Sequence, residues 1–217
     1  MRRLTEEKEK HVVFAFGRMN PPTAGHSKLV DKVHSHAKSI GADHKVIVSH
    51  SQDKHKNPLS SAQKMRYLKH VHPHGKFEAS SHSQPHVFAH LAKMHKEGHT
   101  HVTMVAGSDR VHEFHKLINK YNGKKGSHGY YKFKSLKVVS AGARDPDATG
   151  VAGISGTKMR AHASNNDYKS FKSGLHKNTS HGEAKKLFHA TRKGMGLKEG
   201  QTRLSFGAFL NEQRSSI

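Results

Sequence analysis

Cysteine is absent from this chain of 217 residues, and acidic side chains are scarce. Without cysteine, a disulfide framework and a thiolate metal site are both excluded. No apolar run approaches the roughly 20 residues that a helix needs to cross a bilayer. Residues 1–8 also lack the apolar core of a secretory signal. We therefore expect a cytoplasmic protein without a membrane partner.

The shortage of acids leaves a strongly basic chain, because 16 acidic residues stand against 38 basic ones and the formal net charge is +22. Such a surface suits polyanions, namely nucleotides, nucleic acid or an acidic protein shell. The same charge is also compatible with a solvated basic face that binds no specific partner.

Histidine is unusually frequent, with 23 residues, several of them in close pairs such as His112 and His115. Metal sites usually recruit carboxylates or thiolates beside histidine, and both are rare or missing here. We therefore expect no metal ligand and interpret most of the histidines as polar surface residues.

Hydrophobic residues make up only 33% of the chain, so a core has to come from a few dense strands. Short apolar runs alternate with segments of helical spacing. The predicted strands are 11–16, 45–49, 77–79, 101–106 and 136–140. The predicted helices are 26–40, 61–70, 84–96, 109–121 and a later one near 183–192. This alternation predicts an α/β fold, a Rossmann-like open parallel sheet of about five strands with helices on both faces.

Composition divides the chain further. We expect a flexible N-terminus at 1–10, one main domain at 11–165 and a small C-terminal helical appendage at 166–193. Three glycines predict a flexible linker at 194–203. The last segment, 204–217, has Phe206, Phe209 and Leu210 at helical spacing. It is either a strap on the domain or a docking peptide.

The most informative stretch runs from Gly17 to His26, between the first strand and the first helix. A helix N-terminus offers unpaired N–H groups and a positive dipole end, which together favour phosphate. His26 stands at this helix start and can hydrogen-bond a phosphate oxygen. Gly25 allows a ligand to approach the backbone closely.

A second helix start is predicted at residues 154–160, with Ser155 as its cap. It brings two hydroxyls, on Ser155 and Thr157, together with the cations Lys158 and Arg160. Two anion-binding helix starts in one small domain indicate a triphosphate held between them.

These two stretches resemble the motifs of the nucleotidylyltransferase superfamily. Thr23-Ala24-Gly25-His26 is similar to its (His/Thr)-x-Gly-His motif, and Ile154 to Arg160 is similar to its Ile-Ser-x-Thr-x-x-Arg motif. The Gly-Arg-x-x-Pro opening at Gly17 looks most like archaeal-type nicotinamide mononucleotide adenylyltransferases and phage-encoded cytidylyltransferase-like proteins. Two further stretches, residues 57–60 and 107–109, resemble loops of the superfamily more weakly. Two departures are Thr23, where many members carry His, and Gly156, where many carry Ser.

The resemblance implies that an acceptor phosphate attacks the α-phosphorus of a nucleoside triphosphate and that pyrophosphate leaves. ATP and nicotinamide mononucleotide are favoured, while CTP and other phosphate acceptors stay open. Mg²⁺ is the implied cofactor, held mostly by substrate and water. The implied catalytic residues are His26, Thr23 and Arg160. The implied nucleotide-binding residues are Gly17, Arg18, Asn20, Gly25, Ile154, Ser155, Thr157 and Lys158. Asp109 and Arg144 are expected to bind the acceptor.

An alternative belongs to a different class. The fold can be catalytically weak or inactive and serve as a basic nucleic-acid-binding or virion-associated module. The charge and the tail favour this reading, and Leu210-Asn211-Glu212 resembles the Leu-x-Glu cleavage sites of tailed-phage head proteins. A phage-encoded protein would then work in the host cytoplasm or join a phage head assembly. An aminoacyl-tRNA synthetase fragment is a weaker candidate, because the chain is short.

Overall fold

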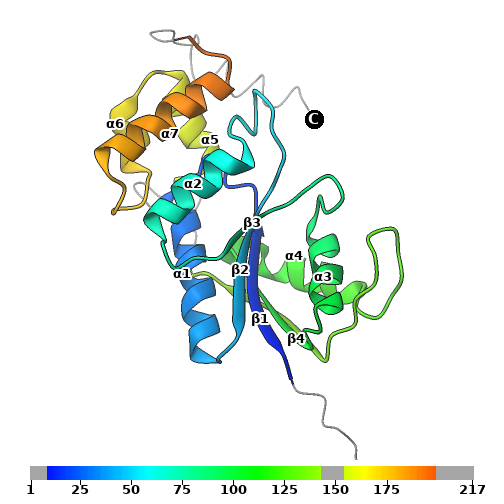
Figure 1. Ribbon diagram of the computed structural model, residues 1–217. Coiled ribbons are helices and arrows are strands. Elements are labelled where there is room, and N and C mark those ends of the chain that lie inside the picture. Colours follow the sequence, from blue (N-terminus) through cyan, green and yellow to red (C-terminus); the bar gives the residue numbers. More distant parts are fainter. Residues whose placement is uncertain (1–8, 143–153, 199–217) are drawn as a thin grey trace, which may run out of the picture.

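A five-stranded parallel sheet forms the centre of the molecule, seen in a computed structural model that describes residues 9–142 and 154–198 (Figure 1). Its order is β3-β2-β1-β4-β5, and every neighbouring pair is parallel. The strands are β1 His11–Gly17, β2 Asp43–Val48, β3 Phe77–Ala79, β4 His101–Ala106 and β5 Ser135–Ser140. The predicted α/β fold is confirmed.

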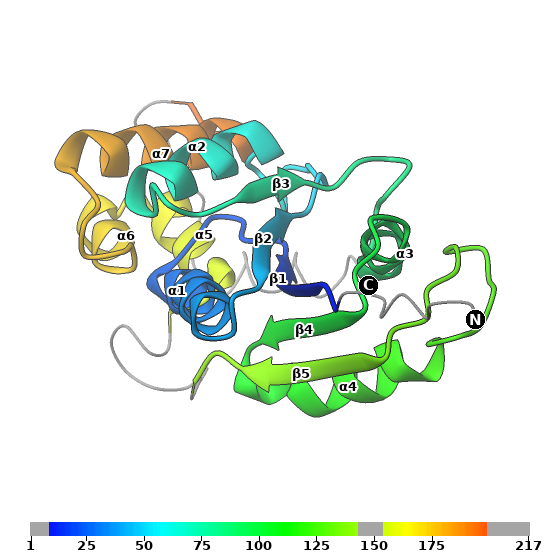
Figure 2. The same ribbon diagram turned by 60° about the horizontal axis from the view of Figure 1, so that its bottom comes forward.

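Helices cover both faces of the sheet, and the alternation of β1 divides the core between them (Figures 1 and 2). Val13 and Ala15 belong to one apolar cluster, and Val12 and Phe14 belong to the other. The first cluster includes α1 Ala24–Ser39 and α2 Ser61–Val71, and the second includes α3 Val87–Lys96 and α4 Val111–Lys120. A strand buried on both faces needs a continuous apolar run, which β1 has.

Three further helices pack against one another beyond the carboxyl ends of the strands, and the last of them also packs against α2 (Figure 1). They are α5 Gly156–Ser164, α6 Tyr168–Ser173 and α7 His181–Gly194. Helix α6 was not predicted, because it is six residues long and buries one side chain, Phe171. The first residues of the flexible linker expected at 194–203 belong to the packed fold instead, since Gly194 ends α7 and Met195 is buried.

The predicted bounds of β3 and β4 agree with the structure, and the others differ by a few residues. The helix expected from 84 begins at Val87, because Pro85 disfavours helical geometry in the residue before it. The helix expected from 109 begins as a 3₁₀ turn, Ser108–Arg110. Residues 1–8 of the flexible N-terminus expected at 1–10 lie outside the described residues, and so do the tail expected at 204–217 and residues 199–203 before it.

Histidines occupy the interior as well as the surface. His112 and His115 are exposed, as predicted, whereas His72, His90 and His99 are buried. In the described part of the chain, no helix combines the length and apolar character that crossing a membrane requires.

Candidate functional site

The loop that follows β1 lies at the carboxyl edge of the sheet, at the strand from which the order of strands proceeds in both directions. From β1 the chain proceeds outward through β2 and β3, and it then returns to add β4 on the other side of β1. Ligands of open parallel sheets bind outside the strand ends at such a switch point. The loop 18–23 after β1 and the 3₁₀ turn Ser108–Arg110 after β4 both follow strands at this edge.

Two buried side chains fix the course of this loop. The amide of Asn20 donates to the carbonyl of Leu59 and accepts from its N–H, both at 2.9 Å. The ammonium of Lys64 donates to the carbonyls of Arg18 at 3.0 Å and Ser49 at 2.5 Å. The loop after β1 is thereby tied to the segment after β2 and to α2.

The start of α1 is a capping box in which a histidine replaces the usual acid or amide. The Thr23 hydroxyl accepts from the N–H of His26 at 3.3 Å, and Nδ1 of His26 accepts from the N–H of Thr23 at 3.1 Å. Because Nδ1 is an acceptor, a neutral His26 carries its proton on Nε2. The capping contact therefore fixes the tautomer that presents Nε2–H as a donor.

Gly25 is exposed at the same helix start. Its N–H has no hydrogen-bond partner within residues 9–142 and 154–198, whereas the N–H of Ala24 donates to the carbonyl of Gly174 at 2.9 Å. An orphan amide at a helix N-terminus is a donor for an anion.

The start of α5 has a similar form. Ser155 caps it and accepts from the N–H of Lys158 at 3.2 Å. Among the described residues, the N–H groups of Gly156 and Thr157 have no partner. A Cβ on Gly156 would stand 3.2 Å from the carbonyl oxygen of Asn20 and 3.3 Å from Nη1 of Arg160. The small residue at this position permits a close approach of α5 to the loop.

Arg160 joins the two helix starts. Its Nη1 donates to the carbonyl of Asn20 at 2.7 Å, and its Nη2 donates to the hydroxyl of Thr157 at 3.1 Å. The side chain is buried, and its Nε has no partner among the described residues. An unpaired buried donor indicates a place for a further acceptor.

A second arginine faces this buried one. Burial and, to a smaller extent, the nearby positive charge of Arg18 together lower the pKa of Arg160 to about 10, while Asp53 opposes the shift. Arg18 is exposed at the start of the loop. Two guanidinium groups close enough to repel one another form a site that an anion stabilises.

The donor set at this edge does not fit a protein-held Mg²⁺, which prefers oxygen ligands. The carboxylate that acts on Arg160 is that of Asp53, and it is already engaged. Its Oδ1 accepts from the amides of His55 and Lys56, and its Oδ2 accepts from Asn57. Burial alone would raise the pKa of Asp53, but these hydrogen bonds hold it below its ordinary value. A Mg²⁺ ion would have to arrive with phosphate oxygens and water.

The remaining predicted residues divide by their surroundings. Gly17 ends β1, and its carbonyl accepts from Ser49, while Ile154 packs against the core beside α5. Asp109 is exposed in the turn after β4. Asn20 and Thr23 are buried and shape the loop, so direct contact of their side chains with nucleotide stays a prediction. Arg144 lies outside the described residues.

Lys64 is the buried residue that sequence reasoning missed. It occupies the apolar face of α2 with Tyr67, Leu68 and Val71, at the spacing i, i+3, i+4 and i+7. A lysine in the middle of an apolar stripe is the signal that was available in the sequence. Its ammonium is desolvated, and this burial lowers its pKa to about 8.

Comparison with known proteins shows the family of the chain. A model of the cytidylyltransferase-like family matches residues 14–162, which is more than half of the chain. Comparison with curated proteins gives no match.

Solved structures resemble the chain in fold. The nicotinic acid mononucleotide adenylyltransferase of Plasmodium falciparum, complexed with NaAD, aligns with a TM-score of 0.53 and 14% identity over 85% of this chain and 96% of its own. A protein described as a nicotinate-nucleotide adenylyltransferase of Vibrio parahaemolyticus aligns with a TM-score of 0.50 and 15% identity, over 82% of this chain and 98% of its own.

Proposed function

Since the chain belongs to the cytidylyltransferase-like family, we propose that it transfers a nucleotidyl group from a nucleoside triphosphate to a phosphate-bearing acceptor. The observation that carries this proposal is the pair of helix starts whose amides have no partner in the described part of the chain, joined through Arg160 and flanked by Arg18. This arrangement suits an extended polyphosphate better than a single phosphate, because donors converge on it from two elements.

The proposed reaction forms one bond and breaks one. An oxygen of the acceptor phosphate bonds to the α-phosphorus, and the bond from that phosphorus to the α,β-bridging oxygen breaks. The electron pair leaves with pyrophosphate. No protein nucleophile is required, so catalysis consists of positioning and charge stabilisation.

The residues at the two helix starts take separate roles in this scheme. His26 Nε2–H and the amide of Gly25 would donate to phosphate oxygens at the start of α1. The amides of Gly156 and Thr157 and the side chain of Arg18 would hold the leaving pyrophosphate. Mg²⁺, bound to phosphate oxygens and water, would neutralise part of the polyphosphate charge.

In this proposal Arg160 has a structural role as well as an electrostatic one. Its guanidinium binds the carbonyl of Asn20 and the hydroxyl of Thr157, so it keeps α5 against the loop after β1. Its Nε is the atom that remains for a phosphate oxygen.

ATP is the favoured donor and nicotinamide mononucleotide the favoured acceptor. The Gly-Arg-x-x-Pro opening at Gly17 supports this choice, and structural neighbours named as nicotinic acid mononucleotide adenylyltransferases support adenylyl transfer in general. Asp109, after β4, and Arg144 are the proposed contacts to the acceptor.

A pyrophosphate-release assay tests the proposal. ATP and CTP are each combined with nicotinamide mononucleotide, nicotinic acid mononucleotide, phosphopantetheine and a polyol phosphate, with and without Mg²⁺. We expect Mg²⁺-dependent release with ATP and nicotinamide mononucleotide. A folded protein that binds ATP but turns over none of these acceptors would contradict the enzyme proposal and favour the nucleic-acid-binding alternative.

The variant His26→Ala separates this activity from contamination. We expect kcat to fall about 10²–10³-fold, the loss typical for one donor to developing charge, with little change in the Kd for ATP. An unchanged kcat would remove His26 from the chemistry.

A further inference from the structure

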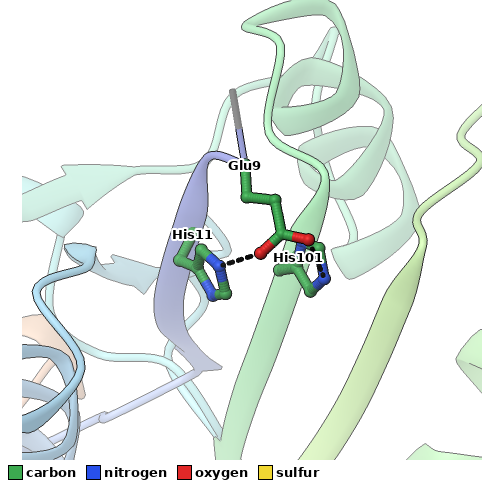
Figure 3. A group of neighbouring side chains, drawn as sticks. All are labelled: Glu9, His11 and His101. Atoms are coloured by element: carbon green, nitrogen blue, oxygen red, sulfur yellow. Dashed lines mark ion pairs between the residues drawn. The ribbon is translucent and has the colours of Figure 1, made fainter. Parts of the chain in front are cut away.

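The amino ends of β1 and β4 bring together a second group of polar side chains (Figure 3). They lie at the opposite edge of the sheet from the loop 18–23 after β1, the proposed nucleotide loop. His11 and His101 are direct partners in the parallel register of these strands. Glu9 precedes His11 by two residues, and the two-residue period of extended backbone places it on the same face. The three side chains therefore converge because of strand geometry.

The donor atoms lie close to the separation that a metal ion requires. Nε2 of His11 is 3.5 Å from Oε2 of Glu9, and Nε2 of His101 is 3.7 Å from Oε1. All three donor atoms lie within 4.8 Å of one another. Ligands about 2.1 Å from a tetrahedral Zn²⁺ are about 3.4 Å apart, so small side-chain shifts bring the three atoms to a common ion.

A hydroxyl orients one of the imidazoles from behind. Thr100 Oγ1 donates to the carbonyl of Lys10 at 3.4 Å and lies 3.0 Å from Nδ1 of His101. When the hydroxyl proton is directed to that carbonyl, Nδ1–H of His101 donates to Oγ1. Nε2 then carries the lone pair, which is the arrangement that outer-shell partners give to metal-binding histidines.

The two imidazole rings lie face to face, so their nitrogen atoms are held on neighbouring strands at one place. They stack with centroids 4.3 Å apart and planes 15° from parallel. Neutral imidazole and carboxylate are ligands for divalent transition metals.

We propose that Glu9, His11 and His101 bind a divalent transition-metal ion, with Zn²⁺ as the best fit. Two nitrogen ligands and one carboxylate suit Zn²⁺ and not the hard ion Mg²⁺, which separates this site from the proposed phosphate chemistry. Three protein ligands leave a coordination position for water. Bound metal links the segment before β1 to β4.

Zinc titration of the chelator-treated full chain tests the site, with NMR detection of the imidazole Cε1–H signals. The first equivalent is expected to shift the signals of His11 and His101 before those of other histidines. Glu9→Gln and His101→Asn are each expected to weaken the first binding step at least tenfold. Thr100→Val is expected to weaken it about tenfold, as outer-shell changes do.

The double variant His112→Ala/His115→Ala is the matched control, because these two exposed histidines lie one helical turn apart on α4 and belong to no candidate metal-ligand group among the described residues. It is expected to leave the first step unchanged. Circular dichroism of each variant without metal confirms that the fold is kept. The proposal is overturned if the first equivalent shifts other histidines, or if Glu9→Gln binds it as tightly as the native chain.

Discussion

Lys64 places a charge where the packing of α2 predicts a hydrocarbon side chain. Its ammonium spans the ends of β1 and β2 through the carbonyls of Arg18 and Ser49. These hydrogen bonds do not need the positive charge, since a neutral amine also donates. Burial disfavours the charged form and lowers the pKa to about 8. The protonated form of Lys64 therefore lowers the stability of the fold beside the nucleotide loop, and the size of this effect depends on pH.

The stability of the protein is expected to rise as Lys64 loses its proton. In the folded chain the pKa is lowered, so between pH 8 and pH 10 the unfolded chain binds more protons than the folded one. Stability then increases with pH, by up to about 1.4 kcal/mol per unit. The free energy of unfolding of the native chain minus that of Lys64→Met should therefore rise by about 2 kcal/mol over this window.

Urea unfolding at several pH values measures this difference. Lys69→Met is the matched control, because Lys69 is exposed on the same helix. Its difference from the native chain is expected to be flat with pH. A flat profile for Lys64→Met as well would show that the ammonium of Lys64 is hydrated.

The sequence predicted some residues of the site but not the contacts that hold them together. Thr23 and His26 were identified from a local pattern, and their capping contact is itself local. The contact of Arg160 with Asn20 spans 140 positions, and that of Lys64 with Arg18 spans 46. The hydrophobic spacing along the sequence does not predict such long-range contacts, because they form only when α2 and α5 pack on the loop.

Helix α7 ends against the loop that follows β2, and Gly194 makes this contact possible. A Cβ at Gly194 would stand 1.9 Å from the carbonyl oxygen of Pro58. The next residue, Leu59, holds the side chain of Asn20. The end of α7 therefore supports the nucleotide loop through one intervening segment.

Gly194→Ala is expected to destabilise the protein by about 1–3 kcal/mol, because overpacking outweighs the gain in helix propensity. Gly182→Ala, in the first turn of the same helix, meets nothing within 4 Å. It is expected to be neutral or to stabilise by about 0.4–1 kcal/mol. Thermal unfolding of both variants checks the contrast. Equal effects would show that α7 moves away from Pro58 without cost.

At the scale of elements, dense apolar runs were the most reliable signal. The bounds of β4 were predicted from one such run. Helix α6 was not predicted, because its sequence is polar and Phe171 is its one buried side chain. Helix α7 was predicted too short, because its last turn contains Gly194, a residue that usually marks a helix end.

At the scale of the whole molecule, several buried or half-buried imidazoles have a lowered pKa in the folded state. Burial lowers the pKa of His44, His72 and His90, and the opposing charge of Asp31 offsets this only in part at His72. A lowered folded pKa means that the unfolded chain binds more protons below about pH 6.5. Stability is therefore lost as the pH falls through this range.

Chemical unfolding between pH 7.5 and pH 5 is expected to show this loss. The carboxylates with lowered pKa, such as Asp53 and Glu183, contribute their stability above about pH 4.5, so they do not change in this window. His90→Gln is expected to reduce the slope, whereas His112→Gln, at an exposed position, leaves it unchanged. An equal slope in both variants would contradict the assignment to His90.

Strand β1 separates the two ends of the molecule by seven residues, and it is hydrogen-bonded along both edges, to β2 and to β4. Transmission between distant sites needs an element with two alternative arrangements. A central strand that is hydrogen-bonded along both edges and buried on both faces has only a single arrangement. The coupling free energy between metal at the amino end and nucleotide at the carboxyl end should then be close to zero. Each ligand would raise the melting temperature by mass action alone, and their combined contributions to stability would add.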